Sequence, residues 1–410
     1  MTVIALINPE TDPHLIADCL ISADGEDRRD KQLVWLPSLG LIRTGWQEPK
    51  GPWHIVRMGR KTIILPNNGG ILAFAGDCKS AFEFWISLSD TINNKHGYNP
   101  DARVDSALID LVLSGMGVAA FKFHMLGVLI DESGVRRPFI HNSEKIVETS
   151  NFGTCYFAGS GTNKLSAAVI SEDERHSAIS DWPWDKISPT EELVESLCST
   201  MLYFESDARY SINPNTPLFD RFGGFYEWYG VKEDGIRFMP TRIDLNLLVE
   251  NDKLFVTRLH LYEPIKPRDP KKTIFKGQQA VLSVLTFCSK LIEIPVEDLF
   301  KDKLEITVNQ VDAVLIERMF ASYDRPSNID PRFSGIVPTE VLADSFADPV
   351  EIRRVRLVIS MNGNGIAKGL TKIDDDFALA NIVHQDGKTI ITLFEGTTMN
   401  VVDLISRHST

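Results

Sequence analysis

The chain has 410 residues, of which 43% are apolar and 24% are charged, a composition typical of a globular protein of two or three domains. Its 56 acidic residues outnumber its 43 basic residues and give a formal net charge of -13, which disfavours a nucleic acid or an anionic membrane as the main partner. The five cysteines are scattered without a CxxC pair, which favours a reducing compartment and indicates neither a disulfide framework nor a zinc site.

The first residues predict two strands. Thr2 to Ile7 is a short β-branched run, and His14 to Ser22 is a second apolar run that follows two prolines. The start of the chain lacks the basic segment and cleavage site of a secreted protein, so we expect a cytoplasmic protein. The most apolar stretch, residues 113–130, contains Lys122 and His124 and therefore predicts a helix end followed by a buried strand, not a membrane span.

A hairpin and two helices are predicted next. Residues 61–65 and 71–75 are apolar runs separated by the turn sequence Pro66-Asn-Asn-Gly-Gly70. Asp77 is a favourable N-cap for a first helix, and apolar residues recur at helical spacing after it and again over residues 104–116.

The same order of elements then repeats. We predict strands over residues 121–130 and in a return run that ends at Gly161, helices over 164–170 and 191–204, and strands over 224–230 and 235–239. Because the strands meet in hairpins and the helices come in pairs, this order predicts two stacked antiparallel sheets between helix layers.

The remaining residues predict a second unit. A hairpin over residues 243–249 and 254–262 leads into the Pro-rich segment 264–270, which we interpret as a linker. A second Pro-rich break covers residues 326–338. The other patterns of this unit are helical near residues 278–292 and 308–321 and strand-like at residues 355–360 and 389–394.

Thr2 directly follows the initiator methionine, and a small second residue is what removal of that methionine generally requires. A threonine at a mature N-terminus carries a hydroxyl nucleophile together with its own base, because an α-amine has an unperturbed pKa of about 7.7–8.0. Threonine in the second position is common, so this role depends on residues elsewhere in the chain.

Asp18 stands sixteen positions after Thr2, in the second predicted strand. Lys61 begins the hairpin that ends at Gly76, and Ala158-Gly-Ser-Gly161 lies between a strand and a helix. In this order, over about residues 2–240, these segments resemble the proteasome β-subunit and HslV family of N-terminal-threonine hydrolases.

The resemblance implies an α+β fold, the αββα sandwich of two antiparallel sheets found in Ntn hydrolases. It would occupy residues 1–263, with an insertion over about residues 24–59. We expect residues 264–410 to form an accessory mixed α/β domain that has no counterpart in the core of the family.

The resemblance also implies a catalytic role for each matching residue. Thr2 Oγ would attack a carbonyl carbon, and its proton would pass to the α-amine, directly or through water, or first to Lys61. Asp18 would pair with Lys61 and fix its position, and Lys61 would supply positive charge that favours the alkoxide. The Gly76 N–H would stabilise the oxyanion at the N-terminus of a helix.

Two further residues would orient the terminal amine. Ser160 matches the serine of the Gly-Ser-Gly segment of the family. The aspartate that acts through this serine is assigned to Asp220, with Asp207 and Asn215 as the alternatives.

The alignment with the family also implies a substrate cleft. Main-chain groups of Ser22 and Gly76 would pair with an extended substrate as an added strand. The pocket beside the nucleophile, suited to a small or apolar side chain, would be lined by Ile21, Ile63, Phe74 and Cys78.

The sequence also departs from the pattern of the family. Val3 replaces a frequent threonine, Leu20 occupies a frequently polar position, and Asp77 places a negative charge next to the proposed oxyanion site. Taken singly, each matching residue has an ordinary explanation, since Asp18 and Lys61 can form a structural ion pair and the glycines can form turns.

We therefore expect a threonine-type peptidase or amidase that hydrolyses peptide bonds through an acyl-enzyme on Thr2 after removal of Met1. Its substrate would be a peptide or protein, and the resemblance implies a homo-oligomer without a cofactor or metal, with any unfoldase or regulator left unidentified. We expect neither a nucleic acid nor a membrane as partner. The alternative is a catalytically inactive proteasome-like scaffold that binds partners.

Overall fold

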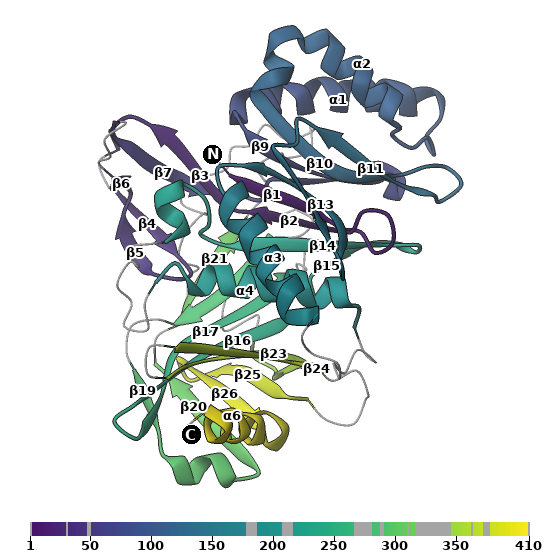
Figure 1. Ribbon diagram of the computed structural model, residues 1–410. Coiled ribbons are helices and arrows are strands. Elements are labelled where there is room, and N and C mark those ends of the chain that lie inside the picture. The colour runs from purple at the N-terminus through teal and green to yellow at the C-terminus, as the bar shows by residue number, and fades with distance from the viewer. Residues whose placement is uncertain are drawn as a thin grey trace.

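The computed structural model describes residues 2–29, 32–46, 51–177, 187–206, 216–265, 281–287, 291–309, 311–316, 346–361, 364–371 and 378–408. These residues form a mixed α/β protein whose strands pair antiparallel, apart from one parallel pair in the second unit (Figure 1). No helix among them is both long and apolar enough to cross a membrane.

Two sheets are stacked in the first unit. One has the order β12 (Lys145–Thr149), β13 (Gly153–Gly159), β1 (Val3–Ile7), β2 (His14–Asp18), β14 (Tyr226–Lys232) and β15 (Gly235–Phe238). The other has the order β11 (Arg136–His141), β10 (Phe123–Ile130), β9 (Gly70–Gly76) and β8 (Thr62–Leu65). An apolar core that includes Ile4, Ala73 and Val128 fills the space between them.

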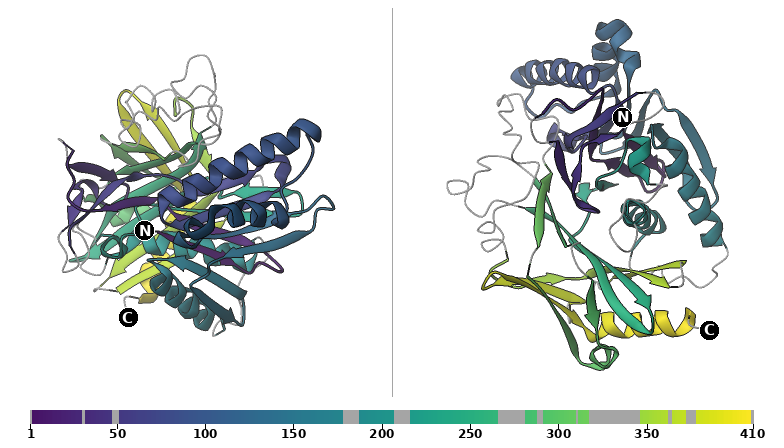
Figure 2. Two further views of the ribbon diagram at one scale, coloured as in Figure 1. Left: turned by 90° about the horizontal axis from the view of Figure 1, so that it is seen from above. Right: turned by 90° about the vertical axis from the view of Figure 1, so that its left-hand side faces the viewer.

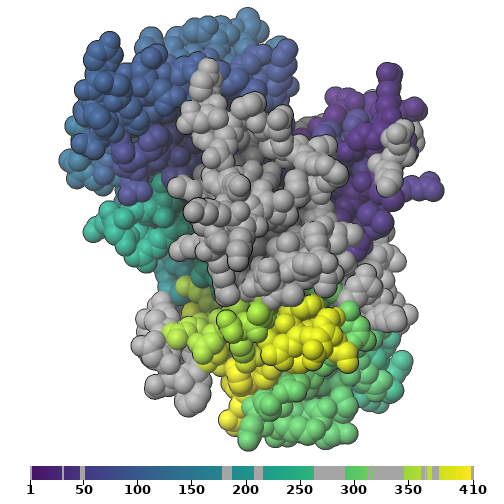
Figure 3. All heavy atoms as spheres, turned by 180° about the vertical axis from the view of Figure 1, so that it is seen from behind, coloured from purple at the N-terminus to yellow at the C-terminus, as the bar shows by residue number. Residues whose placement is uncertain are grey.

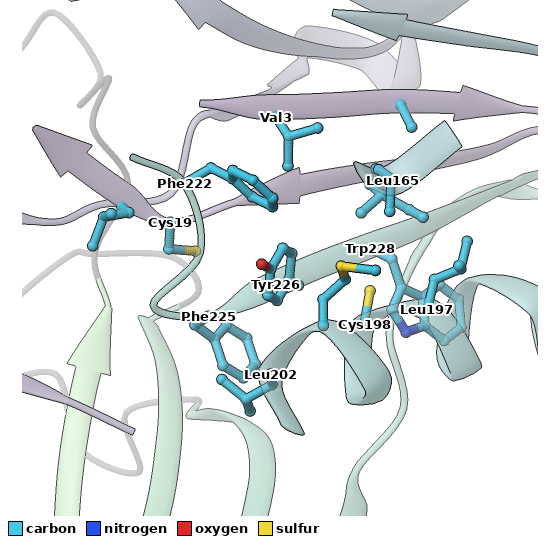
Figure 4. Packing of buried hydrophobic residues seen from close by; sticks show 14 of the residues in the cluster. Val3, Cys19, Leu165, Leu197, Cys198, Leu202, Phe222, Phe225, Tyr226 and Trp228 are labelled. Atoms are coloured by element: carbon cyan, nitrogen blue, oxygen red, sulfur yellow. The ribbon is translucent and has the colours of Figure 1, made fainter. Parts of the chain in front are cut away.

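Helices cover the outer faces of both sheets. The four-stranded sheet shares a core with α1 (Cys78–Tyr98) and α2 (Ser106–Met116), and the six-stranded sheet shares one with α3 (Thr162–Ser177) and α4 (Pro189–Tyr203). In Figure 4, Tyr226 and Trp228 of β14 lie against Leu197 and Cys198 of α4. The first unit is therefore layered as helices, sheet, sheet, helices, with 3-10 turns at Pro66–Asn68, Gly117–Lys122 and Pro217–Asp220.

Local sequence signals account for several of these elements. The hairpin predicted over residues 61–75 is confirmed, and so is the helix predicted after Asp77, whose Oδ2 accepts the Ser80 N–H at 2.9 Å. Along β1 the side chains alternate, so that Val3 faces the layer of α3 and α4 while Ile4 faces the other sheet.

The single strand predicted over residues 14–22 is wrong in one respect. β2 ends at Asp18, and β3 (Leu20–Asp24) leaves the sheet to join β7 (Trp53–Met58) and β6 (Gly45–Trp46). The break is a bend at which the Asp18 carboxylate accepts the N–H of Leu20 at 3.2 Å. The residues predicted as an insertion, about 24–59, form these strands together with the hairpin β4 (Leu33–Leu36) and β5 (Gly40–Arg43).

The second unit is built on two further sheets (Figure 2). In Figure 3 its green and yellow residues lie at the end of the molecule opposite the blue residues of α1 and α2. One sheet has the order β21 (Asp312–Ile316), β18 (Val281–Phe287), β17 (Lys253–Ile265), β16 (Arg242–Glu250), β23 (Arg354–Met361) and β24 (Asn364–Thr371), with β19 (Ile292–Ile294) beside β17. The other has the order β20 (Lys303–Val308), β26 (Lys388–Phe394), β25 (Ala380–Gln385) and β22 (Val350–Ile352). A common core joins them to α6 (Glu395–His408), and a short 3-10 turn spans Val296–Phe300.

Helices predicted near residues 278–292 and 308–321 are wrong. Residues 281–287, 292–294 and 312–316 are strands, because a short apolar run fits either structure and the neighbouring strands decide between them. The predicted linker begins inside β17, which continues to Ile265, while residues 266–270 and the Pro-rich break 326–338 lie outside the described residues. The hairpin of β16 and β17 pairs with β23, so its strands belong to the sheet of the second unit.

Paired charges connect the two units. Arg354 on β23 contacts Glu191 and Glu195 of α4 at 2.7 and 3.2 Å, and Arg356 donates to Ser196 of the same helix at 2.6 Å. Because buried charges are costly unless they are paired, these contacts hold the polar side of α4 against the sheet of the second unit that contains β23.

This arrangement predicts how two truncated chains differ. A chain ending at residue 263 retains the hairpin of β16 and β17 without the core that covers it, whereas a chain ending at residue 240 removes that apolar surface. We expect the longer fragment to aggregate and the shorter one to remain more soluble, as measured by size-exclusion chromatography. Equal solubility of the two would contradict the assignment of this hairpin to the second core.

Candidate active site

Lys61 joins three acceptors, which lie directly before β1, at the end of β2 and at the start of β3. Its ammonium donates to Thr2 Oγ1, to Asp18 Oδ1 at 2.9 Å and to the Leu20 carbonyl at 2.5 Å. An ammonium group has three N–H donors, so all three are used. The side chains of Thr2, Asp18 and Lys61 are almost completely buried, with exposed fractions of 2%, 0% and 2%.

The Asp18 carboxylate receives three main-chain donors besides Lys61. Oδ1 accepts the Val3 N–H at 2.9 Å, and Oδ2 accepts the N–H groups of Leu20 and Gly223 at 3.2 and 2.9 Å. A carboxylate has about four favourable lone-pair sites, so its acceptor capacity is filled. Asp18 therefore fixes the start of β1, the start of β3 and the turn before β14 relative to one another.

Two neighbours hold Lys61 in place from either side. Arg60 Nε donates to Glu227 Oε2 on β14 at 2.7 Å, and the Thr62 hydroxyl donates to Glu227 Oε1 at 2.9 Å. Glu227 pairs with Ala17, which is next to Asp18 in β2. This buried ion pair anchors the segment that carries Lys61 to the strand beside Asp18.

Ser160 and Gly159 meet the main chain of Thr2. The Ser160 hydroxyl donates to the Thr2 carbonyl at 3.4 Å. Gly159 has φ +98°, and a Cβ atom at that position would overlap the Thr2 carbonyl oxygen. Only glycine fits here without moving Thr2.

Gly76 ends β9 with its N–H turned away from β10. Because the Asp77 N–H donates to the Lys122 carbonyl at 3.0 Å, Gly76 and Phe123 form a non-hydrogen-bonded pair. The Gly76 N–H therefore points to the side of β9 that faces β8. On the same side, the Phe74 N–H donates to the Lys61 carbonyl at 3.1 Å. The neighbouring Asp77 carboxylate is engaged in α1, where hydrogen bonds from Ser80 lower its pKa.

Asp220 is not brought to this cluster. It forms a partly exposed ion pair with Lys164 of α3 at 2.7 Å, and no hydrogen bond joins it to Ser160 within the residues that the structure describes. The alternatives Asp207 and Asn215 lie outside those residues.

The residues predicted to line a substrate pocket are mostly buried. Ile63 and Phe74 belong to the core beneath α1 and α2, and Ile21 is 8% exposed. Ser22 and Cys78 are partly exposed, and the buried Ser22 hydroxyl has no hydrogen-bond partner among the described residues. The nucleophile candidate Thr2 and three of the five predicted cleft residues are therefore buried.

Glu205 is a second buried acid near Asp18 that the sequence did not single out. Its Oε1 accepts the Gly224 N–H at 2.6 Å, and its Oε2 accepts the Ser38 hydroxyl. Burial raises the pKa of Glu205 to about 8, and the nearby charge of Asp18 acts in the same direction. In the sequence it is one of several glutamates near an amphipathic helix, and only its distant partners distinguish it.

Comparison of the sequence with models of known protein families and with curated proteins finds no match. Within the described ranges, no group of three or more His, Cys, Asp or Glu side chains is arranged to hold a metal ion.

The tight fit at Gly159 can be tested with a matched pair of substitutions. Gly159→Ala adds both positive-φ strain and overlap with Thr2, so we expect a loss of about 3–5 kcal/mol in the free energy of unfolding. Gly134→Ala, at φ +84° with open space around it, should cost only about 1–2 kcal/mol. Urea denaturation measures both, and equal losses would contradict the close approach of Gly159 to Thr2.

The raised pKa of Glu205 predicts a pH-dependent stability. Between its ordinary value of 4.5 and the folded value of about 8, the folded chain holds a proton that the unfolded chain has released. The free energy of unfolding should therefore fall as pH rises through this window, by up to about 1.4 kcal/mol per pH unit from this group. Urea denaturation across the window should show a shallower fall for Glu205→Gln, and parallel curves would contradict the prediction.

Proposed function

We propose that the protein is an N-terminal-threonine hydrolase of the proteasome type, which cleaves peptide bonds through an acyl-enzyme on Thr2. The observation that carries the proposal is the contact of Lys61 with both the Thr2 hydroxyl and the Asp18 carboxylate. The proposal requires that Thr2 carries a free α-amine in the mature protein.

The chemistry follows from the residues that meet at Thr2. Thr2 Oγ1 attacks the substrate carbonyl carbon and gives its proton to the α-amine, directly or through a water, and that proton then passes to the leaving amine, while Lys61 remains an ammonium that donates to Oγ1. The positive charge of Lys61 stabilises the developing alkoxide. Water hydrolyses the ester on Thr2 and restores the hydroxyl.

Two main-chain features support the same reaction. The N–H of Gly76 points to the side of β9 on which Lys61 lies, where it can donate to an oxyanion. The hydrogen bond from the Ser160 hydroxyl to the Thr2 carbonyl fixes the orientation of the nucleophile. Asp220 has no place in the proposed mechanism, since its partner is Lys164.

The layering supports the fold that this function needs. We infer that helices, sheet, sheet and helices form the αββα sandwich of an Ntn hydrolase, with Thr2 directly before β1. A cytoplasmic location, peptide or protein substrates and a homo-oligomeric assembly belong to the same proposal and follow from the resemblance to the family.

A catalytically inactive scaffold is the second candidate. The observation that favours it is the burial of the site, because Thr2 is only 2% exposed and the predicted pocket residues Ile63 and Phe74 are packed in the core. An active enzyme would have to open this side of the site to admit substrate.

Intact-mass spectrometry with a peptide epoxyketone separates the two candidates. An active enzyme should lack Met1 and gain the mass of one inhibitor, and Thr2→Ala should gain none. Lys61→Met should react about 10²–10³-fold more slowly, because a charge that stabilises the alkoxide is lost.

Asp220→Asn serves as the matched control, and it should react at the wild-type rate because Asp220 lies in the pair with Lys164. Retention of Met1, or labelling that survives Thr2→Ala, would contradict the proposed enzyme.

A further inference from the structure

Two buried carboxylates share one glycine turn. The N–H of Gly223 donates to Asp18 at 2.9 Å, and the next N–H, that of Gly224, donates to Glu205 at 2.6 Å. Consecutive amides of one rigid segment therefore bind the two acids, so a displacement of one contact is transmitted to the other.

The backbone of this turn leaves little freedom. Gly223 and Gly224 have φ values of +119° and +74°, which disfavour other residues. A Cβ atom on Gly223 would overlap Glu205 Oε1, so the carboxyl of Glu205 fills the space that a side chain would take.

Glu205 is itself held by contacts from two other parts of the chain. The Ser38 hydroxyl, from the turn between β4 and β5, donates to its Oε2. The Ser38 carbonyl accepts the Ser206 hydroxyl at 3.0 Å, and Ser206 in turn accepts from Arg258 on β17. The position of Glu205 is therefore fixed by the turn between β4 and β5 and by β17 of the second unit.

We propose that Glu205 is a positioning residue for the pair of Asp18 and Lys61 and acts on it through the turn of Gly223 and Gly224. A neutral Glu205 holds the turn without adding a second negative charge beside Asp18. An ionised Glu205 places a second negative charge near Asp18 and binds the Gly224 N–H more strongly, which displaces the turn that both acids share. This role rests on the proposed function of Thr2.

The charged and titratable groups around Glu205 set the direction of the effect. Asp18 on β2 is negative and opposes ionisation of Glu205, whereas Arg258 on β17 favours it. Tyr226 on β14 is buried, and burial together with these acids raises its pKa well above the ordinary value, so it stays neutral. Ionisation of Glu205 in the alkaline range therefore adds a charge that Arg258 balances only in part.

The coupling can be measured without any enzymatic activity. In the full chain labelled with 15N-glycine, the amide shifts of Gly223 and Gly224 are followed between about pH 6 and pH 10, because the two N–H groups report on different acids. We expect both amides to titrate together with a midpoint near pH 8 and to lose this transition in Glu205→Gln. A transition confined to Gly224, or its persistence in Glu205→Gln, would overturn the inference.

The consequence for reactivity is measured as the rate of epoxyketone addition to Thr2 over the same pH range. The ratio of the Glu205→Gln rate to the wild-type rate removes the titration of the α-amine, which both share. We expect this ratio to be near one below pH 7 and to rise about tenfold by pH 9, because the variant cannot acquire the second negative charge. Glu205→Ala, which loses both anchors, should react about ten- to hundredfold more slowly at every pH.

Glu195→Gln is the matched control. Glu195 lies on α4 and is buried like Glu205, but it faces Arg242 and Arg354 instead of Asp18. Its rate ratio should stay constant with pH. A constant ratio for Glu205→Gln would mean a purely structural role and overturn the inference. Absence of labelling in the wild type would defeat the proposed function instead, and the glycine shifts would still decide the coupling.

Discussion

The buried charge of Asp18 is the constraint on which the first unit depends. Moving a carboxylate out of water costs several kcal/mol unless donors replace the lost hydration. The donors here come from Val3, Leu20, Lys61 and Gly223, which are far apart in sequence. The start of β1, the bend after β2, the start of β8 and the turn before β14 must therefore all be in place before this charge is compensated, so forming the site and forming the fold are one event.

Features decided by a few consecutive residues could be predicted from the sequence. The turn sequence before Gly70 and the N-cap Asp77 have local physical causes, and both appear where the residues predict them. The order of Thr2, Asp18 and Lys61 also carried information, because these residues meet in the structure.

Features decided by distant partners could not be predicted. Residues 281–287 have an apolar pattern that suits a helix, and pairing with β17 on one side and β21 on the other makes them a strand. The resemblance to the family assigns Asp220 to orient the terminal amine through Ser160, but Lys164 is its partner in space. Glu205 has no local signal at all, since its contacts with Ser38 and Gly224 exist only after three separate segments have come together.

The second unit reaches the site through the same long-range contacts. Arg258 of β17 holds Ser206, Ser206 holds the turn that contains Ser38, and Ser38 holds Glu205. Without β17 the Ser206 hydroxyl would lose its donor Arg258, and Glu205 would keep only its first-unit contacts with Ser38 and Gly224. The buried charge of Asp18 is compensated only while its donors stay within hydrogen-bond distance. Strand β17 of the second unit therefore helps to hold the geometry around Thr2, although no hydrogen bond joins Thr2 to the described residues of that unit.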